Sequence, residues 1–199
     1  MCSPLRKKLP DFPWDALAPY GVKARKHPGG IIDLSQGTPV DPTPEFIQKV
    51  LAESANSPSY PTTAGTAELQ QAIRTWAISH LGISGEFDVL PVIGSKELVA
   101  WLPTFLQSQT VLYPKIAYPT YLVGAMLAQS NEIAVDIDAS HWPQADLAWV
   151  NSPANPTGRV HSEDELRSII QWSRKNKAVV ISDECYLEFG DGVTPTSIF

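Results

Sequence analysis

The sequence predicts an α/β fold in which a mostly parallel β-sheet carries helices on both faces. From about residue 86 onward, short apolar segments of strand length alternate with longer segments that have helical spacing. Parallel strands need long crossover connections, and the helices in those connections cover both faces of the sheet. The chain has 199 residues, of which 43% are hydrophobic, so it can bury one substantial core or two small ones.

The first third of the chain is predicted to be mainly helical. Apolar spacing predicts helices over residues 14–26, 44–55 and 66–81. Little core can be built in the earliest part, because its apolar stretches are short. We expect residues 1–40 to form an N-terminal arm and residues 41–199 to form the larger domain.

The remainder of the chain is predicted to hold the sheet. The expected strands are residues 89–93, 110–113, 132–135, 147–150 and 178–182, and the expected helices are residues 95–106, 118–130 and 162–176. In open parallel sheets, ligands bind in the crevice at the carboxyl ends of the strands. Polar motifs follow several of these strands, so the sequence predicts a functional site at that edge.

Composition and charge exclude several classes of partner. The net charge is −6 and no block of like charge is present, which disfavours a nucleic acid or an anionic membrane surface as partner. No apolar run reaches the roughly 18 residues that a membrane helix needs. The two cysteines, Cys2 and Cys185, do not make a disulfide framework. We therefore expect a cytoplasmic protein, and we assign no metal ligands.

The first motif, Ile-Gly-Ser-Lys-Glu at residues 93–97, lies between a predicted strand and a predicted helix. The free backbone N–H groups of Ser95 and Lys96 would point out of the helix start, which is the geometry of an anion site. A Gly-Ser pair before a helix is, however, more often a simple N-cap. By itself the motif indicates phosphate binding only weakly.

The second motif, Asn-Ser-Pro-Ala-Asn-Pro-Thr-Gly at residues 151–158, directly follows an apolar strand. Each proline holds the preceding residue in an extended conformation, which makes the loop rigid. An ordinary Asx-type connection would explain a single Asn-Pro pair. Two rigidly held amides at one strand end exceed what a turn needs, and they indicate a binding role.

The third motif, Ser-Asp-Glu-Cys-Tyr at residues 182–186, ends a strand that is apolar enough to be buried. A carboxylate at that depth is costly unless it meets a cation or a hydrogen-bond donor. Asp183 could simply be held by backbone N–H groups. Tyr186 can bring a phenol to the same pocket, and this favours a functional interpretation.

The fourth motif places Tyr118 before a proline, again after a predicted strand. An aromatic ring held in this way could form a flat wall of a pocket, although aromatic residues near strand ends usually belong to the core. The combination of a phosphate cradle, a stacking ring, fixed amides and a buried Asp with a Tyr is much more specific than any of its members.

Together these motifs resemble the large domain of the class I and II aminotransferases, fold type I enzymes that use pyridoxal 5′-phosphate. The resemblance covers nearly the whole chain and rests above all on the strings at residues 151–158 and 183–186. It implies a cofactor-binding large domain that is incomplete at its C-terminal end and precedes an absent small domain. Residues 1–40 would then be the arm together with a segment of the small domain.

The resemblance implies roles for the residues around the cofactor ring. Asp183 would pair with the protonated pyridine nitrogen and keep the ring an electron sink. Tyr186 and Asn155 would hydrogen-bond the 3′ oxygen of the ring. Tyr118 would stack on the ring face.

The resemblance also implies contacts to the phosphate and to the substrate. The amides of Ser95 and Lys96 would hold the phosphate, while Gly37 and Asn155 would lie at the substrate carboxylate. Tyr60 matches a tyrosine that reaches the phosphate of the neighbouring subunit, which implies a homodimer with its sites at the interface.

Three further strings resemble succinyldiaminopimelate aminotransferases of the actinobacterial type. They are residues 9–15, 94–103 and 182–186. Those enzymes act in lysine and diaminopimelate biosynthesis and exchange an amino group between glutamate and an N-succinylated 2-amino-6-oxopimelate. The resemblance therefore implies this amino acid and keto acid pair as substrates.

One family feature is missing from the sequence. Transamination needs a lysine that binds the cofactor covalently and moves the proton, and in this family it lies on a Ser-x-Ser-Lys-like segment well after the Asp-x-x-Tyr strand. No such segment is present. Four other lysines could be considered as substitutes for it: Lys96, Lys115, Lys175 and Lys177. We expect each of them to have a structural role or to be solvated. Two alternatives stay open: a non-catalytic fragment that binds pyridoxal phosphate, and a C–S lyase of the same fold.

Overall fold

The structure is a computed structural model that describes residues 9–190 and 192–199. It divides into two compact units. One is Pro10–Gly65, and the other is Thr66–Phe199 together with Leu9. In the described part of the chain, no helix is long and apolar enough to cross a membrane.

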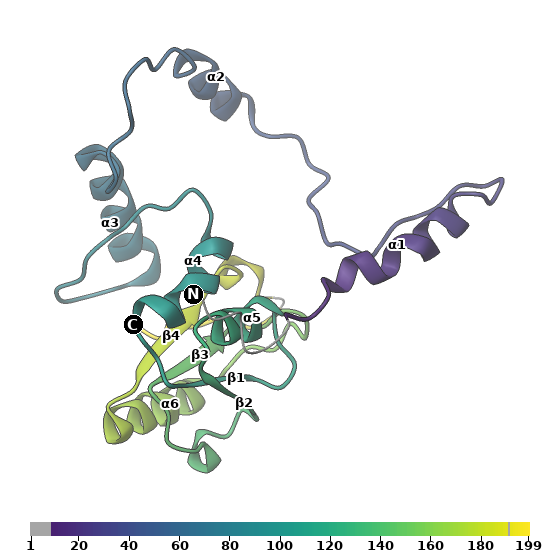
Figure 1. The fold of residues 1–199 in the computed structure, drawn as a ribbon. Coiled ribbons are helices and arrows are strands. Elements are labelled where there is room, and N and C mark those ends of the chain that lie inside the picture. Colours follow the sequence, from purple (N-terminus) through teal and green to yellow (C-terminus); the bar gives the residue numbers. More distant parts are fainter. Residues whose placement is uncertain (1–8, 191) are drawn as a thin grey trace, which may run out of the picture. The chain divides into compact units, whose positions relative to one another are not determined.

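The unit Pro10–Gly65 contains two helices and extended connections (Figure 1). Helix α1 spans Pro13–Ala24 and has a proline in its first turn, where the missing N–H has no intrahelical partner to lose. Helix α2 spans Glu45–Glu53. Neither helix has a buried residue among those described, which agrees with the small core expected for this part of the sequence.

The second unit is built on a four-stranded sheet. Its strands are β1 (Thr110–Pro114), β2 (Asn131–Val135), β3 (Leu147–Asn151) and β4 (Val179–Asp183). The strand order is β2-β1-β3-β4 and every neighbouring pair is parallel. The predicted parallel sheet is therefore confirmed.

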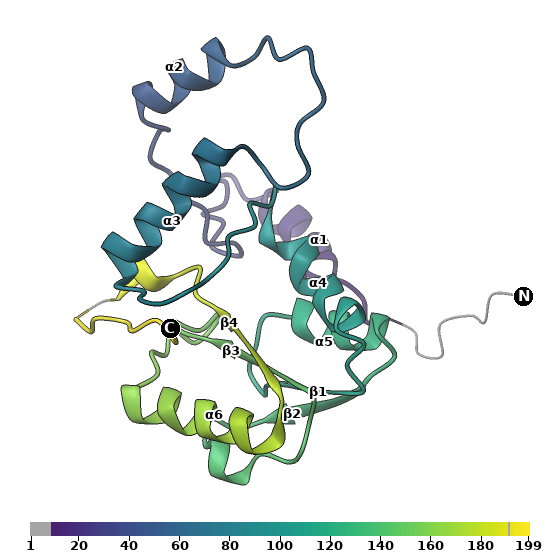
Figure 2. The same ribbon diagram turned by 90° about the vertical axis from the view of Figure 1, so that its left-hand side faces the viewer.

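Helices cover both faces of this sheet. The described part of the unit has four α-helices, which are α3 (Ala67–Leu81), α4 (Ser95–Phe105), α5 (Thr120–Leu127) and α6 (Glu163–Asn176). Two short 3₁₀ turns, Ala139–His141 and Leu187–Phe189, complete it. Helices α4 and α5 pack together on one face, and α6 lies on the opposite face (Figure 2).

Local sequence signals explain where the longer helices begin and end. Thr66 caps α3 by accepting a hydrogen bond from the N–H of Leu69, and α3 ends at Gly82 in the left-handed conformation that glycine tolerates best. Ser162 and Glu165 form a complete capping box at the start of α6. These caps satisfy backbone groups that have no partner within the helix.

The core lies on both sides of β3, which is buried along its whole length. Leu147 and Trp149 belong to the cluster that faces α4 and α5. Ala148 and Val150 belong to the cluster that contains residues of α6. Because successive side chains of a strand point to opposite faces, this one strand serves both halves of the core.

The expected strand at residues 89–93 is wrong. The structure assigns no strand there and pairs the segment with none of the four described strands. The side chains of Leu90, Val92 and Ile93 are exposed. Apolar content indicated strand propensity, but a strand also needs a hydrogen-bonded neighbour, which a local pattern does not reveal.

The topology fixes where a ligand can bind. The chain passes from β1 to β2 on one side of β1, and then returns to β3 on its other side. The strand order therefore reverses between β1 and β3, and the crevice outside such a switch point is the usual ligand site of open α/β sheets. The residues that follow β1, β3 and β4 meet at this edge.

Candidate active site

A pocket of about 180 Å³ lies at the carboxyl edge of the sheet. It is lined by residues of the α4 start, the β1–α5 segment, the loop after β3 and the end of β4. Six of them are site residues expected from the sequence: Ser95, Lys96, Tyr118, Asn155, Asp183 and Tyr186. The others are Val99, Tyr121, Asn151 and Cys185. The structure thus brings together residues up to 91 positions apart, from 95 to 186.

Asp183, the last residue of β4, is held at both carboxylate oxygens. The Tyr121 hydroxyl donates a hydrogen bond to Oδ2 at 2.7 Å, and the backbone N–H of Cys185 donates one to Oδ1 at 3.3 Å. Hydrogen bonds to two different oxygens fix the plane of the carboxylate. The sequence suggested that backbone N–H groups could hold Asp183, and the structure shows one such N–H group together with a side-chain donor, Tyr121.

Asn151, the last residue of β3, joins the rigid loop to β4. Its Nδ2 donates to the carbonyl oxygens of Asp183, at 2.9 Å, and Pro153, at 3.1 Å. Its Oδ1 accepts the backbone N–H of Asn155 at 2.7 Å. The loop has cis peptide bonds before Pro153 and Pro156. One buried amide therefore positions both Asn155 and the main chain of Asp183.

The acidic neighbour Glu184 has a different set of contacts from Asp183. Its Oε1 accepts hydrogen bonds from the Ser182 hydroxyl and from the backbone N–H of Ile198, both at 2.8 Å. Glu184 thus ties the end of the described chain to β4. Only Asp183 of the acidic pair lines the pocket.

Tyr186 and Cys185 face the same pocket as Asp183. Burial and the nearby Cys185 and Asp183 raise the pKa of the Tyr186 phenol, while a hydrogen bond with the Asn155 side chain acts in the opposite direction. Burial and the Asp183 carboxylate raise the pKa of the Cys185 thiol to about 12. Both groups therefore keep their protons at neutral pH and can donate hydrogen bonds.

The start of α4 contributes backbone amides to the pocket. Gly94, rather than Ser95, is the N-cap residue, and no described side chain caps this helix end. A Cβ built on Gly94 would meet no atom within 4 Å. Gly94 therefore has open space beside it at the N-terminus of an eleven-residue helix, the helix end at which backbone N–H groups can hold an anion. The alternative in which Ser95 is only an N-cap is not what the structure shows.

Two expected site residues, Gly37 and Tyr60, belong to the other unit, Pro10–Gly65. Tyr60 is 99% exposed within the described chain. Their assignments to the substrate carboxylate and to a partner's phosphate stay predictions. So do the domain limits at residues 1–40 and 41–199.

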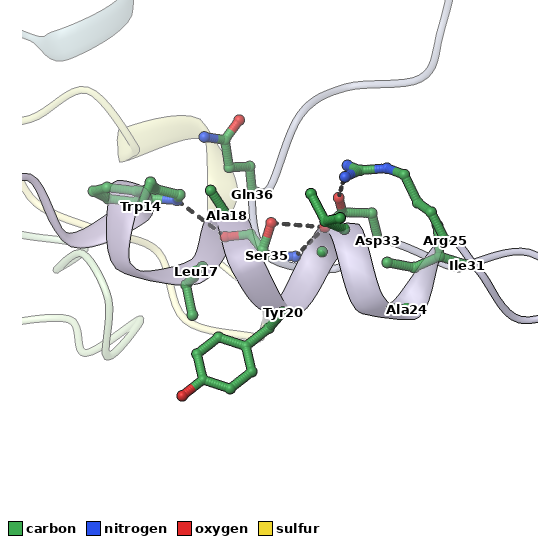
Figure 3. Close-up of a pocket in the computed structure, with 12 residues that line it drawn as sticks. Trp14, Leu17, Ala18, Tyr20, Ala24, Arg25, Ile31, Asp33, Ser35 and Gln36 are labelled. Carbon is green, nitrogen blue, oxygen red and sulfur yellow. Dashed lines mark hydrogen bonds and ion pairs between the residues drawn. The ribbon is translucent and has the colours of Figure 1, made fainter.

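That unit has a cavity of its own, of about 530 Å³, between α1 and the segment that follows it (Figure 3). Trp14 Nε1 donates to the Ser35 carbonyl at 3.2 Å, and the Ser35 hydroxyl donates to Asp33 at 2.6 Å. Arg25 forms an ion pair with Asp33 at 3.5 Å. These contacts hold residues 31–36 against α1. The polar groups named here form hydrogen bonds and an ion pair with one another.

A third cavity, of about 410 Å³, lies on the other side of the loop that follows β3. Its lining includes Lys115, Asp136, Trp142 and His161. Lys115 forms an ion pair with Asp136 at 2.5 Å, as expected for a structural lysine. Lys175 and Lys177 lie at the end of α6, ahead of β4 and thus at the amino edge of the sheet.

Sequence reasoning missed the roles of Tyr121 and Asn151. Tyr121 stands inside a motif that drew attention for Tyr118, and Asn151 was one of two amides expected to bind a ligand, whereas its side chain bonds to the protein itself. A signal for Tyr121 was available: a tyrosine in a predicted and largely apolar helix needs a partner for its hydroxyl once it is buried. The identity of that partner, 62 residues away, required the fold.

Comparison with known proteins shows the family to which the chain belongs. The family described as aminotransferase class I and II matches residues 29–198. A Mycobacterium tuberculosis protein named "Probable aminotransferase" is 47% identical over 196 residues, which is 96% of this chain and 47% of that protein. The 4-dedimethylamino-4-oxo-anhydrotetracycline transaminase of Streptomyces rimosus is 42% identical over 96% of this chain and 55% of its own length.

Solved structures give the same result. The aminotransferase AspB of Helicobacter pylori superposes with a TM-score of 0.85 at 27% identity, over 96% of this chain and 55% of that one. A structure from Thermus thermophilus titled as a probable N-succinyldiaminopimelate aminotransferase gives 0.82 at 26% identity, over 93% and 55%. The chain spans about half the length of the curated relatives it matches. It belongs to the class I and II aminotransferases, a family that depends on pyridoxal 5′-phosphate.

Proposed function

We propose that the chain is the cofactor-binding part of a transaminase that exchanges an amino group between glutamate or 2-oxoglutarate and another amino acid or keto acid. One observation carries the proposal. Asp183, Tyr186, Asn155 and Tyr118 line one pocket at the switch point of the sheet, together with the first two residues of α4. Their chemistry matches the distinct parts of pyridoxal phosphate.

Each group of the pocket suits one part of the cofactor. Asp183 offers a fixed carboxylate to the protonated pyridine nitrogen. Tyr186 and Asn155, which interact with one another, offer donors to the 3′ oxygen. Tyr118 offers a ring face, and the first amides of α4 offer donors to the phosphate. When bound, the cofactor supplies an electron sink that stabilises negative charge at the substrate α-carbon.

The absence of the family's Ser-x-Ser-Lys-like segment from the sequence supports the view that the catalytic lysine lies outside these residues. Lys96 is the lysine among the described residues that line the pocket, and it is the second residue of α4, beside the proposed phosphate site. Lys115 pairs with Asp136 outside the pocket. We therefore propose that these 199 residues bind the cofactor reversibly and do not transaminate unaided. In this proposal the catalytic lysine belongs to the half of the relatives that the chain does not span.

N-succinyl-diaminopimelate is the substrate that we propose, as a step in lysine biosynthesis. Two observations support this proposal. Residues 9–15, 94–103 and 182–186 resemble succinyldiaminopimelate aminotransferases, and the fold is similar to that of the Thermus structure. The Streptomyces relative carries the name of a transaminase for a tetracycline precursor. That polycyclic ketone is therefore the competing substrate to test. The small polar substrates fit a cytoplasmic enzyme.

We propose a homodimer as the assembly of the complete enzyme. Exposed apolar side chains on α2, including Phe46, Val50 and Leu51, support an interface in the Pro10–Gly65 unit. Tyr60 in the same unit is free to meet a partner's phosphate site. Light scattering on the enzyme, with Tyr60→Phe expected to weaken cofactor binding in the dimer, tests this assignment. A monomeric active enzyme would contradict it.

A chimera tests the proposed function. Residues 1–199 are joined to the C-terminal half of the Mycobacterium relative, which is 47% identical over the shared part. We expect the fusion to form 2-oxoglutarate from glutamate with the N-succinylated keto acid as acceptor, and to do so far faster than with the tetracycline precursor. A well-folded fusion that binds pyridoxal phosphate but transfers no amino group would contradict the proposal. Release of a thiol and pyruvate from cystathionine would identify a C–S lyase instead.

A further inference from the structure

The contact between Tyr121 and Asp183 links the core of the unit to the pocket. Tyr121 is fully buried in the first turn of α5, and its hydroxyl lies 2.7 Å from Asp183 Oδ2. Asp183 itself is half-buried at the end of β4. The donor thus comes from the interior, and the carboxylate faces the pocket.

The ring of Tyr121 is held on several sides. It stacks on Trp149, with the centroids 4.8 Å apart, and meets Tyr118 edge-on at 5.8 Å. Gly124 lets α5 approach α4, since a Cβ at this position would lie 2.9 Å from the backbone oxygen of Ala100. Because the ring cannot turn away, its hydroxyl stays at one point.

The hydroxyl is also held as a donor. Burial, reinforced by Asp183, raises the pKa of Tyr121 far above its usual value, so the phenol keeps its proton across the neutral range. Among the residues that the structure describes, the hydroxyl donates its hydrogen bond to Asp183 Oδ2. A hydrogen bond to a half-buried carboxylate contributes more free energy than the same hydrogen bond at the protein surface.

The main chain of Asp183 is fixed independently of Tyr121. Its carbonyl oxygen accepts hydrogen bonds from Asn151 Nδ2, at 2.9 Å, and from the backbone N–H of Ser152, at 3.3 Å. Its Oδ1 accepts the N–H of Cys185. The shorter bond from the Tyr121 hydroxyl to Oδ2 is the second contact that limits rotation of the carboxylate about its Cβ–Cγ bond.

We propose that Tyr121 is the positioning residue for Asp183: its phenol orients the carboxylate toward the pyridine nitrogen and so strengthens the binding of a protonated pyridine ring. The inference rests on the proposed cofactor site. Tyr121 touches no reacting atom in this role. It acts through Asp183, so its effect must depend on the ring nitrogen.

The test compares two ligands in the 199-residue chain. Pyridoxamine 5′-phosphate serves as probe because its amine forms no imine with surface lysines. Its analogue with carbon in place of the ring nitrogen has no group for Asp183 to bind. Dissociation constants are measured by calorimetry for the parent chain and for Tyr121→Phe, which keeps the stacked ring. Tyr113→Phe removes a half-buried phenol from the same apolar cluster and serves as matched control.

We expect Tyr121→Phe to weaken pyridoxamine phosphate binding about tenfold, as for one hydrogen bond to a charged group, and to leave binding of the analogue unchanged. Tyr113→Phe should change neither. Equal losses for both ligands would show a merely structural role and overturn the inference, as would no loss for either. Absence of binding to the parent chain would instead overturn the proposed cofactor site. Near-ultraviolet circular dichroism establishes that each variant is folded.

Discussion

The side chain of Asn151 donates a hydrogen bond to the main-chain carbonyl of Asp183, 2.9 Å away, and so joins the ends of two neighbouring strands at the pocket. The same side chain accepts the N–H of Asn155. One buried amide thus sets the positions of two residues to which we assign the cofactor. Both the stability of the folded chain and its binding of the cofactor should therefore depend on Asn151.

Asn151→Ala should lower the free energy of unfolding by about 2 kcal/mol, because buried donors and acceptors lose their partners. It should also weaken cofactor binding. Urea titration measures the first effect and calorimetry the second. Asn176→Ala, which removes one half-buried hydrogen bond to Trp172 far from the pocket, is the control and should cost less than half as much. Equal costs for the two variants would refute the bracing role of Asn151.

Gly124→Ala should destabilise the unit that holds the sheet by about 1–3 kcal/mol, because the added methyl group meets the backbone of α4. It should also displace Tyr121 and weaken cofactor binding. Gly37→Ala is the comparison, since its Cβ would meet nothing within 4 Å. Thermal melting of both variants provides the check, and a stable Gly124→Ala chain would show that α4 and α5 are not closely packed.

The stability of the chain should fall as the pH drops below about 6.5, in part because of His161. Burial, together with the Arg159 charge, lowers the pKa of His161 in the folded protein from its ordinary value of 6.5. The unfolded chain therefore binds a proton that the folded chain excludes, and acid favours unfolding. Melting temperatures between pH 7.5 and 5.5 measure the loss. His161→Gln should show a shallower decline, and an equally steep decline would contradict this assignment.

The Cys185 thiol should react slowly because it is partly buried, although the residue as a whole is exposed. Its pKa of about 12, raised by burial and by Asp183, leaves little thiolate at pH 8. Alkylation by iodoacetamide, followed at this residue by mass spectrometry, should be at least about tenfold slower in the folded chain than in urea. Asp183→Asn removes the neighbouring charge and should speed the reaction. If the substitution has no effect, the carboxylate does not control this thiol.

In the complete enzyme, Asp183→Ala should abolish turnover while cofactor remains detectable by its absorbance. The carboxylate is needed to keep the pyridine nitrogen protonated, whereas the phosphate and ring-face contacts remain. Asp136→Ala removes an exposed carboxylate paired with Lys115 and is the control. Unaltered turnover in Asp183→Ala would remove Asp183 from its assigned role.

Much of the fold and of the pocket could be predicted because the signals are local. Caps and apolar spacing gave α6 within one or two residues, and the rigid loop after β3 was recognised from its prolines and asparagines. Parallel topology then placed Tyr118, Asn155 and Asp183 at one edge, since all three follow strands. These inferences needed no knowledge of distant contacts.

What could not be predicted depends on partners far away in sequence. Residues 89–93 have the composition of a strand, but no described strand pairs with them. The acceptor for the Tyr121 hydroxyl is 62 positions away along the chain. The assignments of Gly37 and Tyr60 depend on how two units, or two chains, combine. Local patterns carry none of this information.

The most direct test of the account is an absorbance spectrum of the 199-residue chain with pyridoxal phosphate, before and after borohydride reduction and peptide mapping. We predict saturable binding that Asp183→Asn weakens, no reduced adduct at a single lysine, and no spectral conversion by glutamate. A single lysine adduct with a band that glutamate converts would contradict the account, because these residues would then form an enzyme unaided. Absence of any saturable binding would contradict the assignment of the pocket itself.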